Sequence, residues 1–246
     1  MKKLTFLLLL FFGTPGVVWA AQCDEPKITI DAENMGGSDE KDFETALRAS
    51  IVKVCKWWGP TFAGPFKINI EDNRGPSKAL TPGWRGNRGA MLFRTRTTRA
   101  GLSVITHEVV HVFAPNGNRF LAEGFAVYAQ ERFEGHKGYP TFGKELHQAA
   151  KKFLRKADLS AMDRRATPKG LRTDDLSTKS AYIAAGSFIK FLIATHGMEK
   201  IRCLYELTPM VPRVAKQSGA PDRWQDIYGV DLKTLEKSWK AMVASR

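Results

Sequence analysis

Apolar and polar residues repeat along the chain with two periods, and each period predicts a different element. Alternation at every second residue predicts short strands at 27–31, 66–71 and 90–93. Apolar residues spaced by three and four predict helices over 39–58, 100–114, 119–132, 142–153, 177–195, 198–207 and 232–243. The predicted fold class is therefore α+β, with a small mixed sheet in an N-terminal α/β lobe (21–115) and a mainly helical lobe (116–246).

Three details of this pattern concern single residues. Leu102 belongs to the apolar stripe of the helix predicted at 100–114, so we expect it in the core. The helix predicted at 142–153 places His147 on its surface. The segment 72–89 is rich in Gly, Pro, Asn and Arg and predicts an exposed loop.

The first twenty residues have the pattern of a secretory signal peptide. Lys2 and Lys3 precede an apolar run that ends at Phe12, and Val18 and Ala20 occupy the −3 and −1 positions of a cleavage site. A membrane-spanning helix needs about 20 apolar residues, roughly twice the length of this run. We therefore expect cleavage after Ala20 and a periplasmic or secreted mature protein, 21–246, without a transmembrane anchor.

The composition is strongly basic. There are 38 Lys and Arg residues against 25 Asp and Glu, a net charge of +13, which attracts acidic or phosphate-bearing partners. Seven of the basic residues and no acid lie between Asn73 and His107. Either this stretch flanks a cleft for an acidic substrate, with the strand at 90–93 as the edge that binds an extended peptide, or it is solvated surface. A nucleic-acid partner is not expected, because no nucleic-acid-binding motif accompanies the charge and the protein is exported.

Three cysteines allow one disulfide with one thiol left over. We favour Cys23 with Cys55, because Cys55 lies on the apolar face of its predicted helix and the mature N-terminus needs an anchor. The other two pairings and a fully reduced chain remain open.

The residues His107-Glu108-Val109-Val110-His111 form an HExxH motif within a predicted helix. Four residues make just over one helical turn, so both imidazoles project from one face and can bind one zinc ion, with Glu108 beside them as a general base. A catalytic zinc needs a third protein ligand and an open position for water. Glu123, in the apolar start of the next predicted helix, meets this need, because the turn at 115–117 can fold that helix back and Gly124 permits a close approach.

The pair of segments HEVVH and LAEGFAVY resembles the Glu-zincin (gluzincin) metallopeptidases. The resemblance implies a zincin-like fold and one zinc ion per chain, bound by His107, His111 and Glu123. The segment YIAAGSF, which begins at Tyr182, is similar to one in aminopeptidase-like members where a tyrosine stabilises the tetrahedral intermediate. The resemblance alone gives Tyr182 this catalytic role, and the alternative is a core aromatic residue at the start of a helix.

The chain also departs from related patterns. The gap between His111 and Glu123 is shorter than in thermolysin-like and aminopeptidase members, which implies a compact variant. Leu92 and Phe93 stand where aminopeptidases carry the acid that binds a free amine, so aminopeptidase activity is not expected. Ala114 and Gly117 replace the Gly and His of the metzincin pattern.

The expected function is that of a zinc-dependent metallohydrolase, a peptidase acting on a peptide or protein substrate. In this hypothesis Glu108 takes a proton from metal-activated water and passes it to the leaving amine. Two alternatives are a catalytically inactive zinc-binding module that holds an acidic envelope partner, and an amidase acting on cell-wall peptides.

Overall fold

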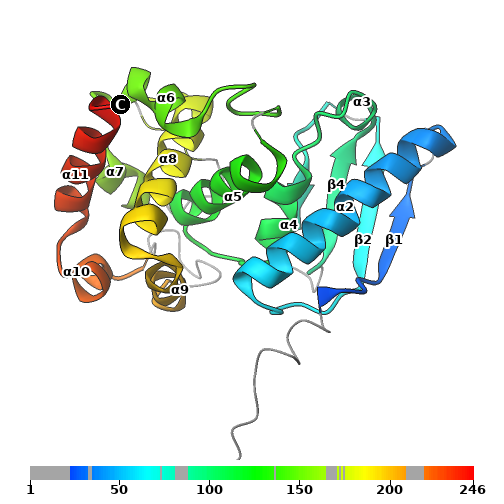
Figure 1. Ribbon diagram of the computed structural model, residues 1–246, viewed down its shortest axis with the longest axis horizontal. Coiled ribbons are helices and arrows are strands. Elements are labelled where there is room, and N and C mark those ends of the chain that lie inside the picture. The colour runs from blue at the N-terminus through cyan, green and yellow to red at the C-terminus, as the bar shows by residue number, and fades with distance from the viewer. Residues whose placement is uncertain are drawn as a thin grey trace, which may run out of the picture.

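The computed structural model describes residues 23–32, 35–72, 74–80, 88–135, 137–164, 171, 173, 175–208 and 219–246. The predicted signal peptide, 1–20, lies outside these residues. The described strands form one mixed four-stranded sheet in the order β1-β2-β4-β3 (Figure 1). Their bounds are β1 Ile28–Asp31, β2 Phe66–Glu71, β3 Lys78–Ala79 and β4 Ala90–Arg94. β1, β2 and β4 are parallel, and β3 runs antiparallel to β4.

Helices make up most of the rest of the described chain. They are α2 Gly37–Trp58, α3 Thr95–Arg99, α4 Ile105–Phe113, α5 Arg119–Glu134, α6 Leu146–Ala150, the 3-10 helix Lys151–Phe153, α7 Leu159–Arg164, α8 Thr178–His196, α9 Met198–Glu206, α10 Arg223–Tyr228 and α11 Leu232–Ala244. The α+β class and the small mixed sheet are confirmed. The change from sheet to helices falls between α4 and α5 (Figure 1). No helix among the described residues has the length and apolar character that crossing a membrane requires.

The central strand β2 is apolar on one face only. Along β2, Phe66, Ile68 and Ile70 are buried and the residues between them are exposed, which is the alternation of a strand with one covered face. α2 lies across this covered face (Figure 1). Its buried residue Cys55 forms a disulfide with Cys23, which confirms the favoured pairing and ties the start of the described chain to α2.

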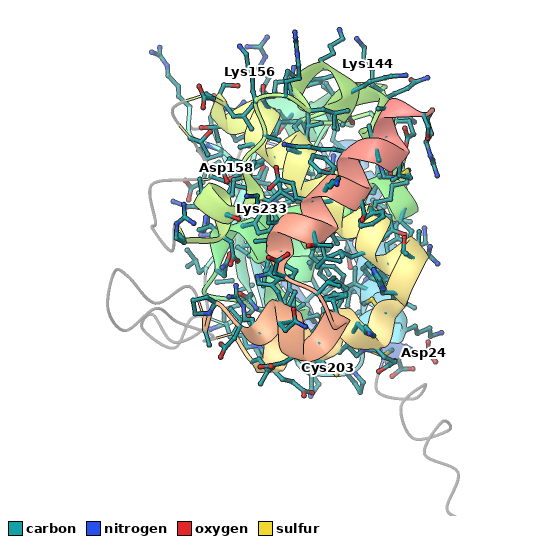
Figure 2. All side chains as sticks on the ribbon, turned by 90° about the vertical axis from the view of Figure 1, so that its left-hand side faces the viewer. Asp24, Lys144, Lys156, Asp158, Cys203 and Lys233 are labelled. Carbon is teal, nitrogen blue, oxygen red and sulfur yellow. A yellow bond between two sulfur atoms is a disulfide. The ribbon has the colours of Figure 1, made fainter. Side chains whose placement is uncertain are left out.

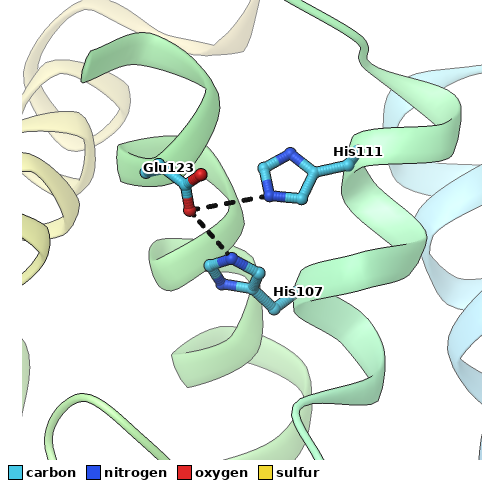
Figure 3. A group of neighbouring side chains, drawn as sticks. All are labelled: His107, His111 and Glu123. Atoms are coloured by element: carbon cyan, nitrogen blue, oxygen red, sulfur yellow. Dashed lines mark hydrogen bonds and ion pairs between the residues drawn. The ribbon is translucent and has the colours of Figure 1, made fainter. Parts of the chain in front are cut away.

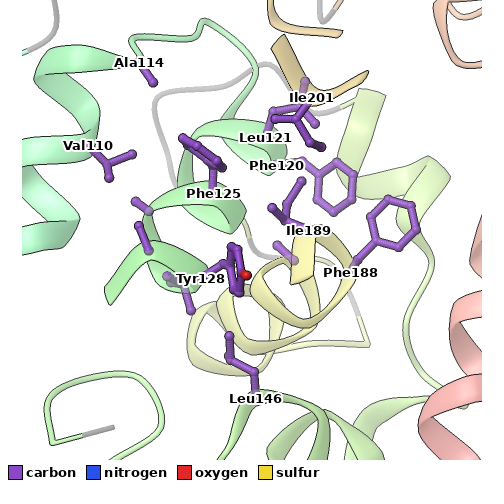
Figure 4. Packing of buried hydrophobic residues seen from close by; sticks show 14 of the residues in the cluster. Val110, Ala114, Phe120, Leu121, Phe125, Tyr128, Leu146, Phe188, Ile189 and Ile201 are labelled. Atoms are coloured by element: carbon purple, nitrogen blue, oxygen red, sulfur yellow. The ribbon is translucent and has the colours of Figure 1, made fainter. Parts of the chain in front are cut away.

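α5 is the central helix of the molecule. Every residue from Phe120 to Gln130 is buried, as expected for a helix with neighbours on all sides (Figure 4). Two glycines, one on each helix, allow α5 to pack closely against α8. A Cβ at Gly124 would lie 2.9 Å from the Ala185 carbonyl oxygen, and one at Gly186 would lie 2.6 Å from Val127 Cγ1. The predicted close approach at Gly124 is thus present, and α8 is its partner.

One face of the helical lobe carries exposed lysines. Lys144, Lys156 and Lys233 are exposed on the face of this lobe that Figure 2 shows, where α11 runs across the view. Beneath this surface the core is aromatic, with Phe188 in contact with Trp224 and Trp239.

The prediction of one helix over 100–114 is wrong at its start. α3 ends at Arg99, Gly101 has a φ of +63°, and α4 begins only at Ile105. The intervening residues lie outside both helices, so Leu102 is 41% exposed and not in the core. The glycine breaks a periodicity that the apolar residues alone would continue.

The helix predicted at 142–153 also begins later, at Leu146. Phe142 has a φ of 45° and is 55% exposed, so it belongs to the preceding loop. The prediction that His147 lies on the surface of this helix is also wrong, because His147 is 2% exposed. Its Nδ1 lies 2.8 Å from the hydroxyl of Ser187 on α8.

Candidate metal centre

The candidate site lies where α4 and α5 pack against each other. α5 begins after Asn118, whose side-chain oxygen accepts a hydrogen bond from the N–H of Leu121 and caps the helix. At the other side of the turn, Arg88 donates to the carbonyl of Val112 and satisfies the end of α4. The turn therefore folds α5 back across α4, as the sequence predicts.

His107, His111 and Glu123 come together at this contact (Figure 3). Glu123 Oε2 lies 3.0 Å from His107 Nε2 and 3.6 Å from His111 Nε2. No two of the three ligand atoms are more than 4.8 Å apart. The two imidazoles come from successive turns of α4, and the carboxylate comes from α5.

This geometry fits a zinc ion. Ligand atoms about 2.1 Å from a tetrahedral zinc are about 3.4 Å from one another, close to the 3.0 and 3.6 Å that separate Glu123 Oε2 from the two imidazole nitrogens. Two imidazole nitrogens and one carboxylate oxygen are a donor set that zinc prefers, and three protein ligands leave one position open. His111 keeps 17% of its side chain exposed, so the cluster is not sealed from solvent.

Glu123 is held as a carboxylate despite being 3% exposed. Burial alone would raise its pKa, but His111, His107 and Arg119 together outweigh burial and hold the pKa well below its usual range. Arg119 Nη2 lies 2.7 Å from Glu123 Oε1, the oxygen that does not face the histidines. The negative charge required of a metal ligand is therefore present before any ion binds.

Glu108 is buried beside the cluster and directed toward the sheet. Its Oε2 accepts a hydrogen bond of 2.7 Å from the N–H of Ala79 in β3. Burial raises the pKa of Glu108 to about 7, and the charge of Glu123 adds to this increase, although His107 and the Ala79 N–H oppose it. A carboxyl group with a pKa near 7 can both accept and release a proton near neutrality.

Tyr182, at the start of the second turn of α8, lies on the His107 side of the cluster. The two rings are nearly parallel, with centroids 6.4 Å apart, and Arg119 Nη2 donates to the tyrosine hydroxyl over 3.2 Å. Burial raises the pKa of this hydroxyl, so it is a neutral hydrogen-bond donor at physiological pH. The tyrosine thus lies near the candidate ligands and is only partly buried, which does not fit a purely core aromatic.

Two features of the site are absent from the sequence prediction. Arg119 connects Glu123 to Tyr182, and the only sequence signal for it is its position one helical turn before Glu123. Strand β3 lies in a segment predicted as loop. Because β3 pairs with β4, the strand at 90–94 is not the edge of the described sheet, and the edge beside α4 is β3.

The basic stretch between Asn73 and His107 serves more than one purpose. Arg88 is partly buried and caps α4, and Arg94 donates to the carbonyl of Arg74. Lys78 is exposed on β3, next to the residue that binds Glu108. Arg85 and Trp84 lie outside the described residues. Trp57 stacks on Phe125 in the core.

Comparisons of the chain with protein-family models, with curated proteins and with solved structures found no match. The chemistry of the site is therefore inferred from its own geometry.

Proposed function

We propose that the chain is an exported zinc-dependent metallohydrolase with a zincin-like fold, acting as a peptidase. The observation that carries the proposal is the convergence of His107, His111 and Glu123 on one point, with Glu108 buried next to them. Two histidines one turn apart and a carboxylate on a facing helix form a three-ligand set with an open fourth position.

Each residue has a role that its surroundings support. A bound zinc ion supplies Lewis-acid activation of water and of a carbonyl group. His107, His111 and Glu123 hold the ion. Glu108 accepts a proton from the attacking water and delivers it to the leaving amine. Its carboxylate is withdrawn from solvent, and within the described part of the chain the Ala79 N–H holds only Oε2.

Tyr182 acts as the hydrogen-bond donor to the oxygen of the scissile carbonyl as negative charge develops there. Its support is the stacked position against His107 and the neutral state of its hydroxyl. A donor that is fixed in place before the reaction stabilises the transition state more than the ground state.

A peptide substrate is favoured by the edge strand beside the site. β3 lies at the end of the described sheet, and edge strands pair with extended peptides through backbone hydrogen bonds. Lys78 on this strand would favour acidic side chains in the substrate. Export is supported by the Cys23–Cys55 disulfide, since disulfides persist in oxidising compartments.

The first experiment measures zinc per chain in protein purified from the periplasm of an expression host without added metal. We expect about one zinc in the wild type and in Glu44→Gln, a control that removes an exposed helix carboxylate on α2, and far less in His111→Ala. Absence of zinc and other transition metals from the wild type, even after metal loading, would refute the proposal.

The second experiment measures cleavage of a pool of internally quenched peptides. Glu108→Gln should keep the zinc and lose cleavage by about 10²–10⁴-fold, because the general base is gone. Tyr182→Phe should also keep the zinc and lose about 10²–10³-fold. Full activity of Glu108→Gln would contradict the mechanism.

The same assay separates the alternatives. Zinc in the wild type without cleavage of any peptide would favour the inactive binding module. Release of peptides from isolated peptidoglycan fragments, with no cleavage of linear peptides, would favour the cell-wall amidase.

A further inference from the structure

Arg119 occupies a position that the proposed mechanism leaves without a task. It is the first residue of α5, one turn before Glu123, and 34% of its side chain is exposed. One nitrogen, Nη2, contacts both Glu123 Oε1 at 2.7 Å and Tyr182 Oη at 3.2 Å. A single guanidinium therefore joins a candidate metal ligand on α5 to a candidate catalytic hydroxyl on α8.

The contact with Glu123 determines which oxygen faces the histidines. Arg119 binds Oε1, and this leaves Oε2 directed at His107 and His111. A carboxylate without such a partner can rotate or bind a metal through both oxygens. With Oε1 in a charge-assisted hydrogen bond, Glu123 is restricted to one ligand atom.

The contact with Tyr182 determines the direction of the tyrosine proton. The hydroxyl oxygen accepts an N–H from Arg119, so its own hydrogen remains available for another acceptor. Within the part of the chain that the structure describes, we find no acceptor for it. The hydrogen bond from a cation also polarises the hydroxyl and makes it a stronger donor.

We propose that Arg119 is a positioning residue that holds Glu123 as a one-oxygen ligand and Tyr182 as a donor to the reacting carbonyl. This inference rests on the proposed function, because it assigns the role within that same site. It differs from an ordinary pair of oppositely charged residues one turn apart on a helix. Such pairs on exposed faces contribute little, whereas Glu123 is 3% exposed and has two histidines on its other oxygen.

The chain contains a matched control for this pair. Arg48 and Glu44 on α2 have the same spacing of four residues and a contact of 2.6 Å, but their side chains are 45% and 39% exposed and lie outside the site. Arg48→Met removes an arginine from such a pair without touching the site. Arg119→Met makes the same chemical change at the site.

The test measures zinc affinity by competition with a chromophoric chelator, and the visible absorption of the cobalt-substituted protein. We expect Arg119→Met to bind zinc about 10–100-fold more weakly, the usual effect of losing a residue that holds a metal ligand. Its cobalt spectrum should weaken, because a two-oxygen carboxylate raises the coordination number. Arg48→Met should match the wild type in both measurements.

Arg119→Lys separates the two contacts. Arg119 makes both contacts with Nη2, and a lysine side chain ends one bond short of that atom. Its ammonium can still pair with Glu123, one turn away on the same helix, but should not reach Tyr182 on α8. We expect this variant to recover most of the zinc affinity and to cleave the peptide pool with the lowered kcat and unchanged KM of Tyr182→Phe. Combining Arg119→Lys with Tyr182→Phe should then cause no further loss, since both changes remove the same interaction.

The outcomes distinguish the two proposals. If the wild type binds zinc, and Arg119→Met binds it equally well with an unchanged cobalt spectrum, the role of Arg119 is refuted and the proposed function stands. If the wild type binds no zinc, the proposed function fails and the role of Arg119 fails with it. If Arg119→Met does not fold, Arg119→Lys decides, and additive losses in its combination with Tyr182→Phe would overturn the inference.

Discussion

Two buried carboxylates in this molecule sit in clusters of opposite character. Asp163 on α7 accepts hydrogen bonds from Asn118 and Arg223 on one oxygen and from Trp224 on the other. All of its partners are donors supplied by the protein. Glu123 receives one charged donor, Arg119, on one oxygen, while its other oxygen faces the Nε2 atoms of two histidines.

The two clusters differ in which polar groups still lack a partner. In the Asp163 cluster the charge of Asp163 is paired with that of Arg223, and Arg223 is 1% exposed, so the ion pair is shielded from solvent. In the Glu123 cluster three atoms with lone pairs converge, and a site of this kind is completed by protons or by a cation. A buried charge alone is therefore no sign of function. A convergence of lone pairs on a point near solvent, in contrast, is a sign of function.

The largest expected effect is the loss of stability when the Asp163 cluster, the closed one, loses its negative charge. Asp163→Asn leaves the Arg223 guanidinium buried without its counter-charge, and removing one member of a buried pair costs about 3–5 kcal/mol. We expect this loss in the free energy of unfolding measured with urea. Asp226→Asn, an exposed neighbour on α10, should stay within about 0.5 kcal/mol of the wild type.

A double variant tests the cause of that loss. Asp163→Leu combined with Arg223→Met removes both charges, so it should be more stable than Asp163→Asn. A double variant as unstable as the single one would mean that packing, rather than an unpaired charge, explains the effect.

The next effect concerns metal removal. A ligand at about 100 times its dissociation constant that binds only the folded protein raises the free energy of unfolding by about 2.7 kcal/mol, and the proposed zinc site predicts this increment for the wild type. Thermal unfolding with and without a chelator measures this increment. His111→Ala should lose it, whereas Asp163→Asn should keep it on top of its own lower stability. Loss of the increment in Asp163→Asn would show that the two clusters are not independent.

The sequence contained the information for elements with strong periodicity. The strand at 66–71 and the helices near 39–58 and 177–195 lie where the pattern predicts them, since each buries one face against a neighbour. Some of the shortest elements were not predicted. β3 has two residues and α10 has six, too few for a clear period to show. β3 depends on pairing with β4.

The contacts of the candidate site also divide into those that the sequence predicts and those that only the structure shows. His107 and His111 follow from one helical turn, and Glu123 follows from a charge within the apolar segment 120–129 of the next helix. The hydrogen bond from Arg119 to Tyr182 joins residues 63 positions apart, and the one from Ala79 to Glu108 joins residues 29 positions apart. Local patterns carry no information on such pairs, so only the folded chain shows them.

A smaller effect concerns His147, a buried group that stays neutral. Burial lowers its pKa to about 4, with Lys190 adding to the decrease and Glu145 opposing it. Because the folded pKa is below the unfolded value of about 6.5, the unfolded chain binds the proton first, and stability falls as the pH drops from 6.5 toward 4. We expect His147→Gln to remove about 1–2 kcal/mol of this pH dependence, measured as unfolding free energy at pH 7 and pH 5. An identical pH dependence in both proteins would show that another group is responsible.

The last prediction makes the same change in both clusters. Glu123→Gln, like Asp163→Asn, turns an acid into an amide, and in the metal-free protein it should lower the free energy of unfolding by less than Asp163→Asn does, although by more than the loss of an exposed pair, because its neighbours hold the pKa of Glu123 low. The reason is that Arg119 keeps a third of its side chain in water and can be hydrated, whereas Arg223 cannot. The amide can also donate a hydrogen bond to an unprotonated imidazole nitrogen, which replaces the contact of His107 Nε2 with the carboxylate. Equal losses for the two substitutions without metal would mean that Glu123 is a structural charge, and the distinction between the closed cluster and the open one would fail.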